Sequence, residues 1–173
     1  MLRRPEPNDA HAVFQRYSSD RVALKYVGWP AHDSEAATRS FLAFSDAEWR
    51  KWPAGPLLIL SRAEGRLLGS TGLAFETTDT ASTGYVLASD AWGQGYATEA
   101  LDAVVALAGA LGVRRLTALC HAEHHASARV LEKAGFTREA WLASHTVFPN
   151  LGVLDPQPVL LYAIQPARHH VQA

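Results

Sequence analysis

Apolar residues recur along the chain with two different periods, and these periods outline the predicted elements. Short apolar or alternating runs bounded by turn residues predict β-strands. A spacing of three and four residues predicts a helix with one buried face. The clearest helical spacing is that of Leu101, Val104, Val105, Ala108 and Leu111. Strands are expected near residues 2–5, 57–62, 66–76, 83–88, 113–122, 136–147 and 157–165.

Capping residues indicate where the other helices begin or end. Asn8 and Asp9 favour the start of a first helix, because their side chains accept hydrogen bonds from free N–H groups. Asp33 or Ser34 favours the start of a second helix for the same reason. Gly135 favours the end of a fourth helix, since glycine readily takes the left-handed conformation at a C-cap.

The predicted elements follow the order β-α-α-β-β-β-α-β-α-β-β. Short turns between the second, third and fourth strands imply antiparallel neighbours, whereas the crossover through the third helix implies a parallel neighbour. We therefore expect an α/β fold with a mixed, mostly antiparallel sheet of about seven strands flanked by about four helices. The length of 173 residues suits one domain. No repeat or linker divides the chain, so we predict a single domain over residues 1–173, with a core at about 2–164 and a short C-terminal tail.

Composition excludes several broad classes of function. Sixteen basic and seventeen acidic side chains leave a formal net charge of −1, so binding of nucleic acid or of an anionic membrane is not expected. No apolar run reaches the length of a transmembrane helix, and the first residues lack the apolar region of a secretory signal. The single cysteine, Cys120, cannot form an internal disulfide, which fits a cytoplasmic location.

The string AWGQGYATEA, residues 91–100, lies between a predicted strand and a predicted helix. Gly93 and Gly95 lack a Cβ, so the backbone there can turn sharply and approach a ligand closely. The following helix directs free N–H groups and its positive dipole end at the turn, which is typical of a phosphate-binding site. Thr98 stands where a dinucleotide fingerprint needs glycine, and no Gly-Lys-Ser/Thr string is present, so a nucleotide-binding module is disfavoured. A turn that only connects two elements is the plain alternative.

Three strings together carry a resemblance to a known family: TGYVLASD (83–90), AWGQGYATEA and HHASARVLEKAGF (124–136). With them the chain resembles the GNAT acyltransferase superfamily, and more closely the RimJ/RimL-like branch that acetylates ribosomal-protein N-termini. The resemblance extends over about residues 2–164. It implies the GNAT fold, whose fourth and fifth strands splay apart. It also implies an N-acetyltransferase that moves an acetyl group from acetyl-CoA to a primary amine by direct attack of the amine on the thioester.

The same resemblance implies which residues bind acetyl-CoA. The strand before the glycine turn pairs with the pantetheine arm, and the turn surrounds the pyrophosphate. His124 stands where relatives commonly carry a cofactor-binding Asn, and imidazole can replace one of the amide's hydrogen bonds. The implied cofactor-binding residues are Val86, Leu87, Ala88, Gly93, Gln94, Gly95, Tyr96, Ala97, Thr98 and His124.

Three positions are candidates for the chemistry of acyl transfer. A main-chain N–H near Leu87 is expected to donate to the developing oxyanion. Ser127 matches a serine of the RimL-like branch and is expected to protonate the leaving thiolate, because the tyrosine that several relatives use is Leu131 here. His121 is the candidate general base, since a histidine pKa lies near working pH. The structural alternatives are a helix N-terminal hydroxyl for Ser127 and a strand-end or solvent-facing ring for His121.

The acceptor and the partners are less constrained. Similar domains act on many amines, so the acceptor is expected to be a peptide N-terminus or a small molecule. The string HAEHH offers no regular set of ligands, and no metal is expected. The chain is expected to be a monomer or a homodimer, and a non-catalytic domain that binds or senses acyl-CoA is the alternative function. Candidates for the wall of an acceptor site are Tyr26, Trp29, Trp52 and Trp141.

Overall fold

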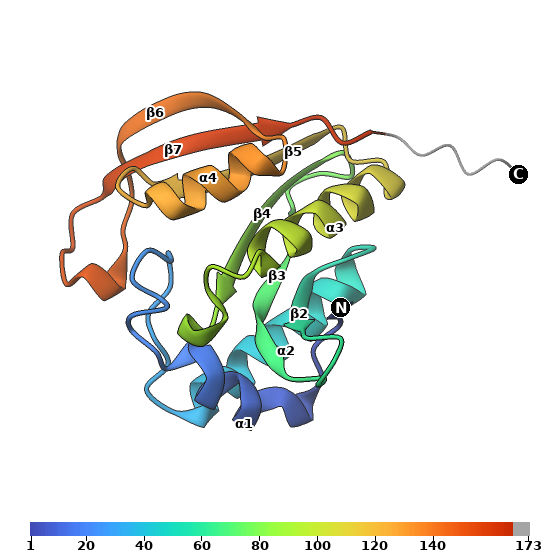
Figure 1. Ribbon diagram of the computed structural model, residues 1–173, viewed down its shortest axis with the longest axis vertical. Helices are drawn as coiled ribbons and strands as arrows, with labels where there is room; N and C mark the ends of the chain where they lie inside the picture. Colours follow the sequence, from blue (N-terminus) through green and yellow to red (C-terminus); the bar gives the residue numbers. More distant parts are fainter. Residues whose placement is uncertain (168–173) are drawn as a thin grey trace, which may run out of the picture.

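Seven strands form one mixed sheet in the computed structural model, which describes residues 1–167 (Figure 1). Their order across the sheet is β1-β2-β3-β4-β5-β7-β6. Neighbouring strands are antiparallel except β4 and β5, which are parallel, so the predicted mixed and mostly antiparallel α/β sheet is confirmed. The strands are β1 (Leu2–Arg3), β2 (Pro56–Leu60), β3 (Leu67–Phe75), β4 (Thr80–Leu87), β5 (Arg115–His121), β6 (Thr137–Thr146) and β7 (Gln157–Ile164).

Helices and short helical turns connect the strands. Ser34 caps α2, where its hydroxyl accepts a hydrogen bond of 3.4 Å from the N–H of Ala37. The first helical segment begins at Pro7, before the predicted caps, because the fixed φ of proline suits the first position of a helix. The α-helices are α1 (Ala10–Val13), α2 (Glu35–Lys51), α3 (Tyr96–Ala110) and α4 (His125–Lys133). The helical turns are η1 (Pro7–Asp9), η2 (Phe14–Ser18), η3 (Ser89–Ala91) and η4 (Pro149–Leu151).

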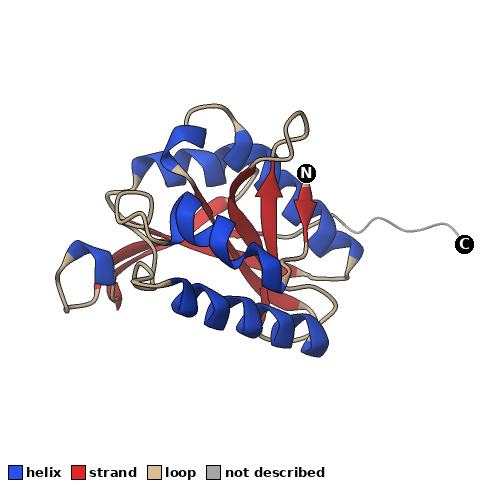
Figure 2. Cartoon of the chain, turned by 90° about the horizontal axis from the view of Figure 1, so that it is seen from below, coloured by secondary structure: helices blue, strands red, loops and turns tan. Residues whose placement is uncertain are grey.

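Helices cover both faces of the sheet (Figure 2). On one face, Leu101 of α3 and Leu131 of α4 share a core with Tyr162 of β7. On the other face, Tyr17 of η2 packs with Val86 of β4. Complete burial of a side chain such as Leu101, which is 0% exposed, stabilises the fold by about 1.5–3 kcal/mol. The two cores hold β4 from both sides. The end of the predicted C-terminal tail, residues 168–173, lies outside the described residues.

The parallel pairing between β4 and β5 is short. It ends at Ser82 and Thr117, while β4 continues to Leu87, so the two strands splay apart as predicted. The N–H of Ala88 donates a hydrogen bond of 2.8 Å to the C=O of Leu68 in β3. Because successive residues of an antiparallel strand direct their main-chain groups to opposite sides, the N–H and C=O of Leu87 face the opening between β4 and β5.

Candidate functional site

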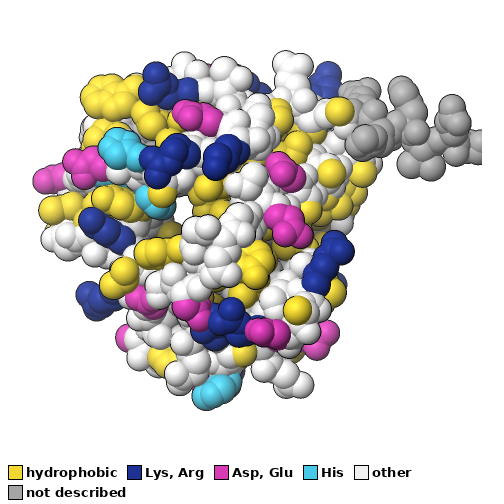
Figure 3. Space-filling view, in the orientation of Figure 1, with side chains coloured by type: hydrophobic (Ala, Val, Ile, Leu, Met, Phe, Trp, Pro, Cys, Tyr) yellow, Lys and Arg dark blue, Asp and Glu magenta, His cyan; other side chains and the backbone are white. Residues whose placement is uncertain are grey.

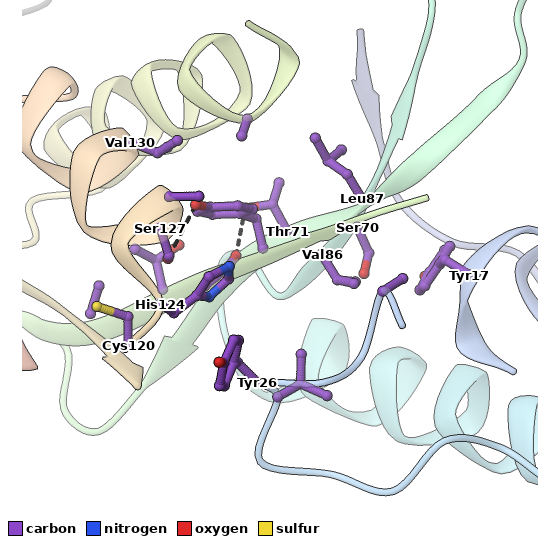
Figure 4. A pocket seen from close by; sticks show the side chains of 18 of the residues that line it. Tyr17, Tyr26, Ser70, Thr71, Val86, Leu87, Cys120, His124, Ser127 and Val130 are labelled. Atoms are coloured by element: carbon purple, nitrogen blue, oxygen red, sulfur yellow. Dashed lines mark hydrogen bonds between the residues drawn. The ribbon is translucent and has the colours of Figure 1, made fainter. Parts of the chain in front are cut away.

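A cavity of about 960 Å³ occupies the opening between β4 and β5. Residues of α3, of α4 and of the turn before α3 line one end, and residues of the segment 22–32 line the other. Figure 4 shows Ser127 and Val130 of α4 at one side of this cavity, and Ser70 and Tyr17 at the opposite side. The cavity therefore joins the two faces of the sheet at the place where the strands separate.

The glycine turn before α3 has the backbone that the sequence predicted. Gly93 and Gly95 have φ angles of +73° and +82°, and a Cβ at either position would meet no atom within 4 Å. Among residues 1–167, no backbone carbonyl accepts a hydrogen bond from the N–H groups of residues 93–98. These N–H groups and the positive end of α3 form a concave donor surface of the kind that binds anions.

The predicted residues of this turn do not all reach the cavity. Gln94 is not part of the cavity wall, because its side-chain amide donates a hydrogen bond of 2.9 Å to the C=O of Asp90. The N–H of Gln94 remains on the surface formed by the turn. The predicted residues that do line the cavity are Gly93, Gly95, Tyr96, Ala97 and Thr98.

The end of β4 presents one free main-chain donor to the cavity. Val86 and Leu87 line the cavity, whereas Ala88 does not, and the N–H of Ala88 is bonded to β3. Of the three residues predicted to pair with pantetheine, Leu87 is therefore the one whose main chain faces the opening. The C=O of Leu87 accepts a hydrogen bond of 3.0 Å from the indole Nε1 of Trp92. That bond fixes the strand end against the glycine turn and gives Trp92 a structural role that the sequence did not indicate.

Ser127 lies in the first turn of α4 and is 8% exposed. Its hydroxyl oxygen accepts a hydrogen bond of 3.1 Å from the phenolic O–H of Tyr85 in β4. Both residues line the cavity beside the apolar side chain of Leu131. Burial raises the pKa of the Tyr85 phenol, and the hydrogen bond to Ser127 opposes part of that increase. With Tyr85 as donor, Ser127 keeps its own proton free to donate into the cavity.

Tyr85 was not among the residues singled out from the sequence. The available signal is the period of two along β4, which places the side chains of Tyr85 and Leu87 on the same face. This period indicates the face of β4 on which the Tyr85 side chain lies, but not which residue it contacts. The contact with Ser127 depends on how far β4 and β5 diverge.

His121 lies behind the cavity and not in its wall. It is 3% exposed, stacks on Tyr26 with ring centroids 4.7 Å apart, and meets Phe148 edge-on at 5.0 Å. Its Nδ1 accepts a hydrogen bond of 3.1 Å from the N–H of Glu123, which assigns the ring proton to Nε2. Burial lowers the pKa of His121. In this tautomer neither ring nitrogen is free to take a proton from a ligand in the cavity.

Basic side chains border the cavity. Arg129 and Lys133 line it from one face of α4, and Lys25 lines the opposite end, with its Nζ 4.8 Å from the centroid of the Tyr26 ring. In the space-filling view, dark blue Lys and Arg side chains lie over α4 (Figure 3). Among residues 1–167, no Asp or Glu lines the cavity. Arg129 and Lys133 were not predicted from the sequence, although their four-residue spacing indicates a shared helix face.

His124 is the N-cap residue of α4 and lines the cavity, with its ring 4.8 Å from the ring of Tyr26. Burial, His121 and Lys25 lower the pKa of His124, so its imidazole is neutral at pH 7. A neutral imidazole has one donor and one acceptor. His124 can therefore serve the hydrogen-bonding role predicted for it.

The segment between η2 and α2 contributes to a largely aromatic end of the cavity that reaches His124 at the start of α4. Tyr26 and Trp29 line it from the segment between η2 and α2, whereas Trp52 and Trp141 lie elsewhere. Two of the four predicted aromatic residues, Tyr26 and Trp29, therefore line the cavity, and their role toward an acceptor stays a prediction. The aromatic residues of this end are Tyr17, Tyr26, Trp29, Phe41 and Phe148.

Residues 1–167 contain neither a cluster of metal ligands nor a membrane-spanning helix. No group of three or more His, Cys, Asp or Glu side chains there is arranged to hold a metal ion. None of the helices in that part of the chain has the length and hydropathy of a membrane span.

The chain is similar to known acetyltransferases in sequence. A model of the protein family described as Acetyltransferase (GNAT) domain matches residues 1–137. The chain is also 28% identical over 148 residues to a protein of Bacillus subtilis (strain 168) named Uncharacterized N-acetyltransferase YoaA. That similarity covers 84% of this chain and 83% of the relative.

Solved structures share the fold. An acetyltransferase of the GNAT family from Bacillus anthracis matches with a TM-score of 0.82 and 26% identity, over 95% of this chain and 93% of that chain. Mycobacterium smegmatis RimJ, in complex with CoA-disulfide, matches with a TM-score of 0.83 and 24% identity, over 95% of this chain and 80% of that chain. Both similarities cover nearly all of the chain.

Proposed function

The chain belongs to the GNAT family of acetyl-CoA-dependent N-acetyltransferases, and we propose that its acceptor is a primary amine that attacks the thioester directly in the cavity between β4 and β5. One observation carries the proposal. The free N–H of Leu87, the hydrogen-bonded pair of Tyr85 and Ser127, and the glycine turn all border this cavity.

The residues at this end of the cavity fit acetyl-CoA. The N–H of Leu87 has no strand partner on the open side, so it suits a carbonyl oxygen of the co-substrate, whereas the C=O of Leu87 is bonded to Trp92. The N–H groups of residues 93–98 suit a pyrophosphate, and Arg129 and Lys133 add positive charge for phosphate groups. His124 supplies a neutral ring with one donor and one acceptor. We infer that these residues, with Val86, hold the co-substrate.

The chain's own groups then divide the catalytic work. Bound acetyl-CoA supplies an activated acyl group with a thiol as leaving group. The N–H of Leu87 is a fixed donor for charge that develops on the acyl oxygen, and such a donor contributes about 10²–10³-fold to kcat. Ser127 donates its proton to the departing sulfur while it receives a proton from Tyr85, and the proton that the acceptor nitrogen loses restores the Tyr85 phenol. Tyr85 is the better acid of the two because it is a phenol.

The acceptor amine has no general base beside it. No carboxylate lines the cavity within residues 1–167, and the Nδ1 of His121 is already bonded, so His121 has no part in this mechanism. We infer that the amine enters in its neutral form. An α-amine with a pKa near 8 is partly neutral at pH 7, whereas a lysine amine with a pKa near 10.4 is almost fully charged. This supports an α-amine or another weakly basic amine.

Release of the CoA thiol from acetyl-CoA, measured with a panel of primary amines, tests the proposal. We expect turnover that depends on the amine, together with saturable binding of CoA by calorimetry. Binding of CoA without turnover of any amine would identify the alternative, a non-catalytic acyl-CoA sensor. Absence of CoA binding at millimolar concentration would overturn the proposed site.

A further inference from the structure

The end of the cavity opposite α3 and α4 is available to the acceptor. The glycine turn, Arg129 and Lys133 lie at the other end, where the proposed function puts the co-substrate. Ser70 and Val86 pair across β3 and β4 and lie between the two ends, close to Leu87. In Figure 4, Ser70 and Tyr17 lie on the same side of the cavity as Leu87 and across from Ser127, so a group bound against Tyr17 and Ser70 lies on the Leu87 side.

The charge of this end disfavours an acceptor with several ammonium groups. Within the described residues its wall contains no Asp or Glu, and Lys25 adds a positive charge. His32 lines the same end, and burial lowers the pKa of its ring, so it is neutral at pH 7. A polyamine or an aminoglycoside would bring uncompensated positive charges into this cavity, and burial of an unpaired charge is strongly unfavourable.

Tyr17 supplies an unused polar group at this end. It is 1% exposed, and its hydroxyl has no hydrogen-bond partner among residues 1–167. Ser45, Trp52 and His121 also carry such unpartnered buried atoms, but none of them lines the cavity. Since buried polar groups in native proteins are nearly always paired, the Tyr17 hydroxyl is the natural partner for a polar group of a ligand.

The character of that polar group follows from the chemistry of Tyr17. Burial raises the pKa of the phenol well above its usual range, and the Ser70 hydroxyl nearby opposes only part of this increase. Tyr17 is therefore neutral at every working pH and carries a proton to donate. A neutral phenol donates to an acceptor oxygen, and an uncharged carbonyl oxygen accepts such a bond without the cost of burying a charge.

We propose that the acceptor is an α-amino acyl compound with an apolar or aromatic side chain, and that the Tyr17 hydroxyl binds the carbonyl beside its amine. The inference rests on the proposed function, because it assumes acetyl transfer in this cavity. The rings of Tyr26, Trp29 and Phe41 receive the apolar side chain. A peptide N-terminus and a single amino-acid amide share this recognition element.

Two amines that differ mainly in the carbonyl test the proposal. Phenylalanine amide and 2-phenylethylamine carry the same ring, but only the first has a carbonyl beside the amine. We expect the ratio of their kcat/KM values, amide over amine, to fall about 10-fold in Tyr17→Phe, which corresponds to the loss of one hydrogen bond. Comparing ratios between enzyme forms removes the effect of the different amine pKa values.

Thermal unfolding distinguishes recognition from folding. The Tyr17 hydroxyl has no partner in the protein, so Tyr17→Phe is expected to keep or raise the Tm. An unchanged ratio of the two amines in a folded Tyr17→Phe variant would overturn the proposal, as would higher kcat/KM for spermidine than for phenylalanine amide in the wild type. Both outcomes leave acetyl transfer intact. Failure of every amine to release CoA thiol would instead overturn the proposed function.

Discussion

The phenolic O–H of Tyr85 donates a hydrogen bond of 3.1 Å to the hydroxyl of Ser127, although 42 positions separate the two residues in the chain. Tyr85 belongs to β4 and Ser127 to α4, so the bond crosses the opening between β4 and β5. It joins two hydroxyl groups in a wall that is otherwise apolar near Leu131. With Tyr85 as the donor, the Ser127 proton is free for another acceptor, which in the proposed mechanism is the departing thiolate.

Removal of either hydroxyl is expected to slow catalysis more than it weakens binding. General acid catalysis contributes about 10²–10⁴-fold, so Ser127→Ala is expected to lower kcat about 10²-fold or more, and Tyr85→Phe somewhat less. The Kd for CoA, measured by calorimetry, is expected to change only a few-fold. Retention of full kcat by Ser127→Ala would reduce Ser127 to a helix N-terminal hydroxyl.

Tyr162→Phe provides a matched control for Tyr85→Phe. The Tyr162 hydroxyl is bonded to the carboxylate of Glu132 at 2.9 Å, on the same helix α4 but outside the cavity. Its loss removes a phenol hydrogen bond to α4 without touching the proposed proton donors. Equal losses of kcat in Tyr162→Phe and Tyr85→Phe would indicate that both act only by positioning α4.

Gly95→Ala is expected to weaken CoA binding beyond its effect on stability. Gly95 has a φ of +82°, and an added Cβ would point into open space above the turn. Gly65 lies in the turn between β2 and β3, has a φ of +64°, and also leaves open space around a Cβ. Both substitutions place alanine in a left-handed conformation at a cost of about 1–2 kcal/mol.

The comparison of these two variants isolates the role of the glycine turn. Both Tm values are expected to fall by similar amounts, whereas the Kd for CoA is expected to rise at least about 10-fold in Gly95→Ala alone, roughly the effect of one lost charge-assisted contact. A Kd that is the same for both variants would mean that the turn only connects β4 to α3.

Sequence patterns predicted the elements well and the details of the site less well. The glycine turn and the Ser34 cap follow from local signals, because glycine and capping residues each act within a few residues, whereas the splay of β4 and β5 was expected only from the resemblance to the GNAT fold. The free main-chain donor at Leu87 is different. The main-chain groups of either Leu87 or Ala88 can face the opening, depending on which of the two residues bonds to β3. The alternation of side chains along β4 does not reveal which residue this is.

The contacts between side chains that face each other across the cavity also could not be predicted from the sequence. A tyrosine in a strand, such as Tyr85, or at the end of a helical segment, such as Tyr17, reads as packing. Only the packed structure shows that the first bonds to Ser127 and that the second has no partner. Such contacts depend on the distance between elements and not on local sequence.

Gly69→Ala is expected to destabilise the sheet strongly. A Cβ on Gly69 would lie 2.0 Å from the carbonyl oxygen of Val86 in the paired strand β4, and a backbone atom cannot move aside cheaply. Gly84 in β4 leaves open space around a Cβ and serves as the control. The midpoint of urea unfolding is expected to fall by the equivalent of about 3 kcal/mol for Gly69→Ala and by less than 1 kcal/mol for Gly84→Ala. Similar midpoints for the two variants would contradict the close approach of β3 and β4.

Stability is expected to fall at acid pH through the pair of Arg3 and Asp9, which ties β1 to η1. Asp9 Oδ1 accepts a hydrogen bond of 2.6 Å from Arg3, and this bond lowers the pKa of the Asp9 carboxyl. A lowered folded-state pKa stabilises the protein above the unfolded-state value near 3.9, and the contribution is lost as pH falls through the folded value. Asp9→Asn is therefore expected to cost about 0.5–1 kcal/mol at pH 6 and progressively less below pH 4. Urea unfolding of both forms between pH 6 and pH 3 measures this, and a constant difference across that range would rule out the Asp9 carboxylate as its source.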